Sequence, residues 1–306
     1  MKTENIFTRP AGLIFFALLT CALWGSAFPA IKTGFALMNI TTAGSKILYA
    51  GYRFTLAGAL SWCMTSLIEK RPAVIQKSSV PAICLQGLLQ TTIQYICFYI
   101  GLSYTTGAKG SVINGSNVFF AILAAHFMIK GENINTKKVI GCLIGFAGII
   151  LVNLKDGNLL GDFSFMGEGM VLLCSVAYGI SSATLKLFSD REKPGTISAY
   201  QLLFGGVLLI LIGQLGGGDI GSFDLKTGLL LLYLSMTTTV SFYLWANLLK
   251  YNPVGKVAIF GFTIPIFGTL FSSIFLHENV MTLTNAAALL LVSVGIIVVN
   301  HDTKKH

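Results

Sequence analysis

Ten apolar stretches, each close to the length of a membrane-crossing helix, fill almost all of this 306-residue chain. The hydrocarbon core of a bilayer is ~30 Å thick and requires about 20 apolar residues per helix, because unpaired backbone groups are costly in lipid. The composition agrees, since 54% of the residues are hydrophobic and only 11% are charged. The chain is therefore predicted to be an all-α polytopic membrane protein. The predicted transmembrane helices cover residues 11–34, 44–68, 80–104, 109–130, 137–154, 165–189, 196–216, 226–250, 254–276 and 281–300.

The second half of the sequence repeats the first. Leu18–Gly25 aligns with Leu172–Gly179, and Gly148–Asn153 aligns with Gly295–Asn300. A cleaved secretory signal is the alternative interpretation of residues 1–28, but the later copy of this stretch argues against it. The alignment predicts a duplicated unit of five helices.

The two predicted units cover residues 1–155 and 156–306. Because five is an odd number, the second unit enters the membrane from the opposite side, and the two units are inverted repeats. Inverted repeats recur in secondary transporters, where one pseudo-symmetric scaffold opens to either side of the membrane by exchanging the conformations of its halves.

The net charge of +9 follows from membrane topology, not from a nucleic-acid partner. Most of the 21 lysine and arginine residues fall in loops on one side of the predicted bundle, the side that holds both termini. The positive-inside rule makes that side cytoplasmic. We expect an integral protein of the cytoplasmic (inner or plasma) membrane with both termini in the cytoplasm, and no nucleic-acid partner.

Motifs for metal or enzyme chemistry are missing from the sequence. The six cysteines fall inside predicted helices without CxxC or Cys/His ligand spacing, so they are interpreted as packing residues. No HExxH, GxSxG or P-loop sequence occurs. We therefore predict no enzymatic activity, no metal, no cofactor and no use of ATP by this chain.

A combination of short motifs carries a resemblance to a known family. The motifs are Ala22–Phe28 in the first helix, Tyr52–Phe54 in the second, Glu132 and Glu278 after the fourth and ninth, and glycines in the fifth and tenth. With these motifs in this order, the chain resembles EamA-type permeases of the drug/metabolite transporter superfamily. The resemblance implies a secondary carrier, often an exporter of amino acids or related metabolites, with a central cavity between the halves.

Polar side chains in the third and eighth predicted helices favour a solute pathway. A carrier needs polar groups near the membrane midplane, where a solute exchanges water for protein hydrogen bonds. Residues four apart share one face of a helix. Such stripes, related by the repeat, are Thr91, Tyr95 and Tyr99 in the third helix and Thr237, Ser241 and Trp245 in the eighth.

Amide side chains add a second polar pattern. Gln86, Gln90 and Gln94 form an adjacent stripe of the third helix, while Asn114 and Asn117 lie in the fourth. Amides both donate and accept hydrogen bonds, which suits a zwitterionic or amide-bearing solute. Hydrogen bonding to neighbouring helices is the alternative for all five side chains.

Two rings and several charges near the midplane complete the candidate site. Trp24 and Tyr178 lie at equivalent positions near the middle of the first and sixth helices, away from the interfacial belts that such rings usually occupy. Arg53 is the charged residue clearly inside a span, and its repeat equivalent is Gln201. It binds either a solute carboxylate or helix carbonyls, and the uncharged equivalent favours the structural role. Lys32 is interpreted as a boundary anchor.

Gly141 and Gly145 form a GxxxG pattern in the fifth helix. Such patterns allow two helices to approach closely, either inside the fold or in a homodimer. We leave a homodimer open as a prediction.

The sequence thus predicts a membrane carrier that moves, in the export direction, a small polar metabolite such as an amino acid by alternating access. Carriers of drugs, sugar phosphates or nucleotide derivatives, and a membrane scaffold without transport, are the alternatives. The expected partners are the lipid bilayer and a small-molecule substrate. The predicted substrate-binding residues are Trp24, Tyr95, Tyr99, Asn114, Asn117, Tyr178, Ser241 and Trp245.

Overall fold

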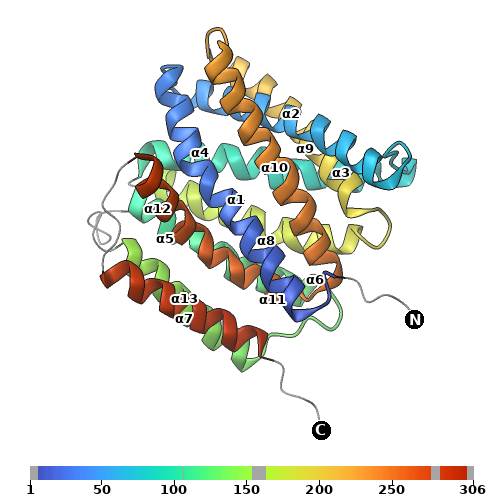
Figure 1. Ribbon diagram of the computed structural model, residues 1–306, viewed down its shortest axis with the longest axis vertical. Coiled ribbons are helices and arrows are strands. Elements are labelled where there is room, and N and C mark those ends of the chain that lie inside the picture. The colour runs from blue at the N-terminus through green and yellow to red at the C-terminus, as the bar shows by residue number, and fades with distance from the viewer. Residues whose placement is uncertain (1–5, 106, 154–162, 277–282, 302–306) are drawn as a thin grey trace.

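The fold was described from a computed structural model, which defines residues 6–105, 107–153, 163–276 and 283–301. Within these residues the backbone forms ten long helical segments, which confirms the predicted all-α fold (Figure 1). The predicted boundary between the halves, at residues 155 and 156, lies outside the described residues. So do Glu278 and the predicted start of the last helix at residue 281.

The helices are α1 (Pro10–Leu37), α2 (Ala43–Glu69), α3 (Val80–Gly87), α4 (Gln94–Tyr104), α5 (Gly107–Gly115), α6 (Asn117–Met128), α7 (Thr136–Asn153), α8 (Met170–Phe188), α9 (Pro194–Leu215), α10 (Leu225–Tyr251), α11 (Val254–Ala258), α12 (Thr263–Leu276) and α13 (Leu283–Asn300). Three of the ten segments consist of two helices in series. In the third segment a π-helical turn, Leu88–Ile93, joins α3 to α4. In the ninth segment a 3-10 turn, Ile259–Phe262, joins α11 to α12. The fourth segment consists of α5 and α6. Helices α5 and α6 meet at Ser116.

Length and composition identify six segments of the described chain as able to cross a membrane. These are residues 10–37, 77–104, 165–188, 194–215, 225–251 and 254–275. Shorter apolar helices cover residues 112–128 and 286–300. A bilayer-spanning helix needs about 20 apolar residues, so these segments fit the predicted membrane location.

Local sequence fixes where several helices begin. Pro10 and Pro194 occupy the first positions of α1 and α9, where a missing backbone N–H has no consequence. Asp224 caps α10, accepting hydrogen bonds from the Thr227 backbone N–H at 2.7 Å and from its hydroxyl at 2.6 Å. The bonds from the Thr227 side chain and then its backbone lower the pKa of the Asp224 carboxyl. Thr42 caps α2 in a similar way.

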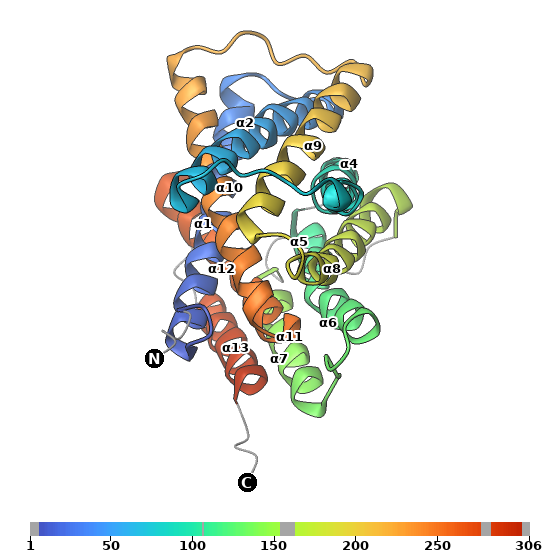
Figure 2. The same cartoon turned by 90° about the vertical axis from the view of Figure 1, so that its right-hand side faces the viewer.

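Two pairs of helices join the halves of the bundle at opposite edges. Helix α2 packs along α9, and α7 packs along α13, so each pair takes one helix from each half (Figures 1 and 2). Glycines allow these close approaches. A Cβ on Gly206 would lie 2.5 Å from the Thr55 backbone nitrogen, and one on Gly141 would lie 2.8 Å from the Gly295 carbonyl oxygen. The GxxxG pattern is therefore used inside the fold.

The two ends of the bundle differ in their interior. We call the end at which α2 ends and α9 begins the base, and the end at which α1 ends and α2 begins the mouth. Helix α1 begins and α13 ends at the base (Figure 1). The largest hydrophobic cluster fills the base half and includes Ala17, Ala121, Leu185, Leu248 and Val257. The interior is thus packed with apolar side chains from the base to about mid-depth.

The α2–α9 contact predicts how a glycine substitution affects stability. Gly206→Ala places a methyl group against the backbone of α2, so we expect a lower unfolding temperature in detergent and a loss of about 1–3 kcal/mol from overpacking. Gly228→Ala is the matched control, because a Cβ there meets nothing within 4 Å and α10 gains helix propensity. Equal unfolding temperatures for the two variants would contradict the close packing.

Candidate functional site

A cavity of about 390 Å³ lies between the two halves of the bundle, on the mouth side of the apolar base. Its lining comes from α1, α2, the third helical segment, α5 and α6 of the first half, and from α8, α10 and α12 of the second half. Several lining residues are near the mouth ends of their helices, among them Lys32, Lys46, Leu102 and Ser272. The cavity therefore extends from mid-depth toward the mouth.

One face of α1 forms a wall of the cavity. Trp24, Phe28, Ile31, Lys32 and Phe35 line it, at the three- and four-residue spacing that puts side chains on a single helix face. Four of these five side chains are largely apolar. Helix α1 therefore offers a solute a mostly apolar surface with one positive charge near the mouth.

The third helical segment forms the most polar wall. Gln90, Gln94, Tyr95, Phe98 and Tyr99 line the cavity from the π-helical turn and from α4. A π-helical turn inserts an extra residue into the helical repeat and is found frequently at functional sites. The turn brings two glutamines to the same cavity as the tyrosines of α4.

The fourth helical segment is broken where it reaches the cavity. Asn114 is the penultimate residue of α5 and Asn117 is the first residue of α6, and both line the cavity. At the break, the Ser116 hydroxyl donates a hydrogen bond to the Ile113 backbone carbonyl at 2.6 Å. The ninth helical segment is broken at the matching position, next to Gly261. Helix breaks at mid-membrane are a recurrent feature of solute sites in transporters.

Aromatic rings close the cavity toward the base. The ring centroid of Trp24 lies 6.0 Å from that of Phe242 and 5.0 Å from that of Trp245. Trp24 and Phe242 line the cavity, whereas Trp245 is 1% exposed and belongs to the apolar cluster of the base. Trp24 therefore separates the cavity from the packed half of the protein.

The structure brings six of the eight predicted site residues into one lining and leaves two outside it. Those in the lining are Trp24, Tyr95, Tyr99, Asn114, Asn117 and Tyr178. Ser241 is fully buried and donates to the Thr238 carbonyl of its own helix at 3.2 Å. Trp245 packs behind Trp24. On α10 it is Phe242 that faces the cavity, one residue away from the predicted stripe, and one residue turns the face of a helix by about 100°.

The glutamines of the third segment divide between packing and lining. Gln86 is fully buried, donates to the Ser181 carbonyl at 3.0 Å and accepts from the Thr184 hydroxyl at 2.6 Å, so it joins α3 to α8. It also donates to Gln90, which lines the cavity. Gln94 lines the cavity too, and its buried Oε1 atom has no hydrogen-bond partner. Gln94 thus contributes an amide to the lining, and the oxygen of that amide is a buried acceptor without a partner among the described residues.

Arg53 is buried at the cavity wall, with 3% of its surface exposed. Its Nε and Nη2 atoms both donate to the Thr238 hydroxyl, at 3.0 Å and 2.8 Å. The guanidinium carbon lies 5.2 Å from the centre of the Phe54 ring. Arg53 therefore forms a structural hydrogen bond and also lies in the cavity lining, so both roles considered from the sequence have a structural basis.

Two lysines in the lining were not predicted as site residues. Lys32, interpreted above as a boundary anchor, and Lys46, near the start of α2, both line the cavity. A sequence signal for Lys46 exists, because it precedes Arg53 by seven residues, which is two helical turns on the same face of α2. Among the described residues that line the cavity, none is an aspartate or a glutamate.

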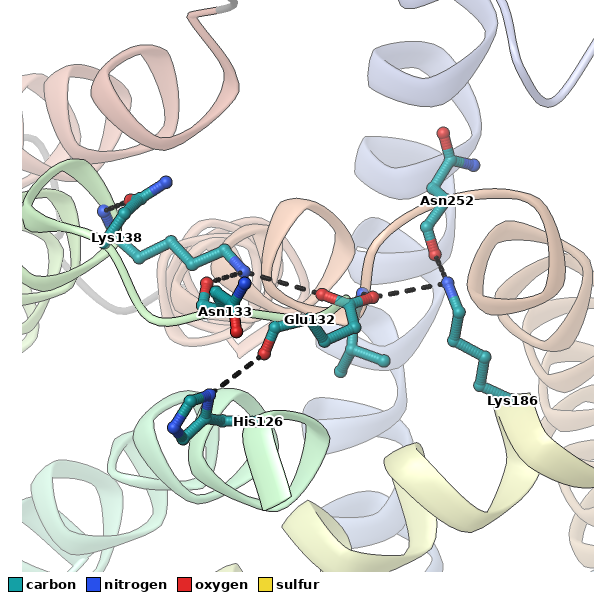
Figure 3. A network of polar contacts seen from close by, with 8 residues as sticks. His126, Glu132, Asn133, Lys138, Lys186 and Asn252 are labelled. Carbon is teal, nitrogen blue, oxygen red and sulfur yellow. Dashed lines mark hydrogen bonds and ion pairs between the residues drawn. The ribbon is translucent and has the colours of Figure 1, made fainter. Parts of the chain in front are cut away.

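At the base, Glu132 is the centre of a polar network that links the halves (Figure 3). Its carboxylate lies 3.4 Å from the Lys186 ammonium and 3.5 Å from that of Lys138, and it accepts from the Val254 backbone N–H at 2.7 Å. Lys186 also donates to the Asn252 carbonyl. The loop after α6 is thereby bound to α8 and to the start of α11.

A second set of contacts at the base joins the loop after α2 to the loop after α8. The Lys193 ammonium lies 2.6 Å from the Glu69 carboxylate, and the Glu192 carboxylate accepts from the Gln76 backbone N–H at 2.8 Å. Both contacts bridge the first and second halves of the chain. The base is therefore closed by apolar packing and, around it, by charged side chains.

The site contains no metal-binding cluster in the part of the chain that the structure describes. All six cysteines are free thiols, and Cys174 lies in the cavity lining. Its Sγ atom is 3.7 Å from Oδ1 of Asn114, so it acts there as a weak donor to a lining amide.

The chain is similar to membrane transporters over nearly its whole length. It is 29% identical over 303 residues to the uncharacterized transporter YvbV of Bacillus subtilis, covering 97% of this chain and 93% of that protein. It is 24% identical over 298 residues to a probable amino-acid metabolite efflux pump of Salmonella typhimurium, covering 91% and 92%. A solved crystal structure shares the fold, with a TM-score of 0.78, 17% identity and coverage of 94% and 95%.

The sequence profile of the EamA-like transporter family matches the chain twice, over residues 12–154 and residues 165–301. The two matches correspond to the two halves that meet at the cavity. With one match in each half and ten helical segments, this chain belongs to the EamA-like transporter family.

Proposed function

We propose that this protein is a secondary carrier that exports a small polar metabolite, such as an amino acid or an amino-acid derivative, by alternating access. The observation that carries the proposal is the cavity itself, which lies between the two halves, reaches toward the mouth and ends at a packed base. A cavity at the interface of inverted repeats is the expected place for a transported solute.

The contrast between the two ends supports alternating access. The apolar cluster and the Glu132 network hold the base closed while the cavity extends toward the mouth. Because most positive charges fall on the side of the termini, we take the base as cytoplasmic and the mouth as outer. The structure then corresponds to an outward-facing conformation. Exchange of the conformations of the two halves would produce the inward-facing one.

The direction of transport and the solute class rest on similarity and on the lining. The Salmonella relative is named as a probable amino-acid metabolite efflux pump, which favours export of a related solute. The cavity combines amides at Gln94, Asn114 and Asn117 with the rings of Trp24 and Tyr178. Such a lining suits a solute with a polar backbone and an apolar side chain.

Flux measurements test the proposal directly. In liposomes containing the purified protein, we expect counterflow of at least one solute from a panel of amino acids and their derivatives. Asn114→Ala and Trp24→Ala should lower flux of the accepted solute about three- to tenfold, the loss expected for one hydrogen bond or ring contact.

Matched controls for these variants lie outside the cavity. Asn300→Ala removes an amide whose Nδ2 atom donates to its own helix, and Trp62→Ala removes a ring that contacts the loop after α2. Both controls should retain wild-type flux once reconstitution is equalised. The assignment of the site is wrong if the cavity variants and the control variants behave alike.

The Glu132 network predicts a measurable change at the base. Glu132→Gln removes the charge that two lysines share, so we expect the base-closed conformation to lose about 1.5–3 kcal/mol, the value of a charged hydrogen bond. Backbone hydrogen exchange should then be faster in residues 182–188 and 254–258. Asp190→Asn, at an exposed position after α8, should leave exchange unchanged. Unaltered exchange in Glu132→Gln would show that the network does not hold the base closed.

The orientation of the chain is tested by tagging. Cleavable tags on both ends should resist an external protease in intact cells and be cut only after the membrane is permeabilised. Cleavage of either tag in intact cells would reverse the assignment of base and mouth.

A further inference from the structure

We propose that the cavity selects an organic carboxylate of net negative charge, and that Arg53 holds the carboxylate group of the solute. This inference rests on the proposed transport function and assigns a substrate class to the same cavity. A carboxylate with a neutral, acylated amine and an apolar side chain, such as an N-acyl amino acid, is the class that the lining fits best.

The lining of the cavity is positively charged. Lys46 and Arg53 both line the cavity, and none of the described lining residues is an aspartate or a glutamate. Charges act over longer distances next to low-dielectric walls than they do in water, and a cleft lined by one sign of charge concentrates the opposite ion. The cavity should therefore attract anions and repel cations.

The buried guanidinium of Arg53 has no counter-ion among the described residues. Its Nε and Nη2 atoms share a single neutral acceptor, the Thr238 hydroxyl, although a guanidinium carries five N–H donors. No carboxylate of the described residues forms an ion pair with it. A charge that is buried without a counter-ion is unfavourable, and a carboxylate accepts two parallel hydrogen bonds from a guanidinium. A bound carboxylate would supply the missing counter-charge.

The repeat argues that this charge is not needed for packing. The equivalent position in the second half holds Gln201, which is fully buried in α9. The fold thus accommodates an uncharged side chain at this position. From the sequence alone this uncharged equivalent favours a structural role for Arg53, but the place of Arg53 in the cavity lining, with one neutral acceptor for its charge, favours binding.

The charges are also arranged in depth. Lys46 precedes Arg53 by seven residues on α2, a separation of about 10 Å along the helix, and it is nearer the mouth. An anion that enters from the mouth meets Lys46 first and Arg53 deeper in the cavity.

The remaining lining describes the rest of the solute. Trp24, Tyr178 and Phe242 provide rings for an apolar side chain. The amide side chains of Gln94, Asn114 and Asn117 in the lining can bond the N–H and C=O groups of a solute amide. An ammonium group would find neutral oxygens but no carboxylate among the described lining residues. These features favour an acylated amine over a free one.

Three probes with the same side chain separate the charge classes. N-acetylphenylalanine, phenylalanine and phenylalanine amide carry charges of −1, 0 and +1 at pH 6, where the free amines are protonated. We expect calorimetric titration of the purified protein to give affinities in that order, with at least tenfold between the first and the last. An equal affinity for all three probes, or a reversed order, would overturn the inference.

Variants of the lining cations test the assignment to Arg53. Arg53→Gln should lower the affinity for N-acetylphenylalanine about 10- to 100-fold and remove the preference over the amide, while Arg53→Lys should restore part of it. Lys46→Gln should lower the affinity about threefold. Because Lys46 is partly exposed near the mouth, this variant tests the positive lining without changing a buried residue, in case the Arg53 variants fail to fold. Arg71→Gln, whose side chain is 66% exposed, is the matched control and should bind as the wild type does. Wild-type binding of N-acetylphenylalanine by Arg53→Gln would overturn the inference.

Counterflow of the same three probes in liposomes distinguishes this inference from the proposed function. Export of the anion in preference to the amide supports both. Transport of all three probes at equal rates would contradict the charge selection and leave the carrier function standing. Charge-selective binding without transport of any probe would contradict the carrier function and leave the anion site standing.

Discussion

The absence of water from the bilayer core is the constraint on which the rest of this structure depends. Backbone groups in lipid must be paired within their own helix, so irregular backbone is tolerated only where protein or a water-filled cavity surrounds it. The breaks next to Ser116 and Gly261 and the π-helical turn at Leu88–Ile93 all lie in segments that line the cavity. At the break next to Ser116, the hydroxyl of this residue donates a hydrogen bond to the Ile113 backbone carbonyl. These three irregular turns therefore lie in segments of the candidate solute site, whereas a further π-helical turn, Phe165–Gly169, precedes α8 and contributes no lining residue.

Two kinds of contact hold the halves together, and they differ in how easily they can change. At the edges, α2 and α9 approach so closely that a methyl group at Gly206 would meet backbone. Sliding there would break many contacts at once, so these pairs act as rigid units. At the base, Glu132 contacts Lys186 through flexible side chains at 3.4 Å. Opening the base would separate this ion pair and would also rearrange the apolar cluster that includes Leu185 and Leu248.

The helical pattern could be predicted from the sequence because its cause is local. A bilayer imposes a length and an apolar composition on each helix, and Trp24, Tyr95 and Asn117 could be placed near mid-depth by counting along it. The direction in which a side chain points is not local. One residue turns a helix face by about 100°, so the stripe that includes Ser241 differs from the Phe242 face that α10 presents to the cavity. Lys46 was missed because a lysine near a helix end ordinarily reaches water, and only the packing of α2 against α4 and α10 places it at the cavity.

Arg53 connects the rigid edge of the bundle with the selectivity of the cavity. It lies on α2, which is locked to α9 by glycine contacts, and its hydrogen-bond partner Thr238 is on α10. In the proposed cycle the walls of α1 and α8 change their arrangement while the α2–α9 pair keeps its internal packing. The positive charge would then remain at one depth as access passes from the mouth to the base. A carrier that rocks around a fixed charge can keep its anionic solute bound throughout, because the counter-charge belongs to the part that does not rearrange.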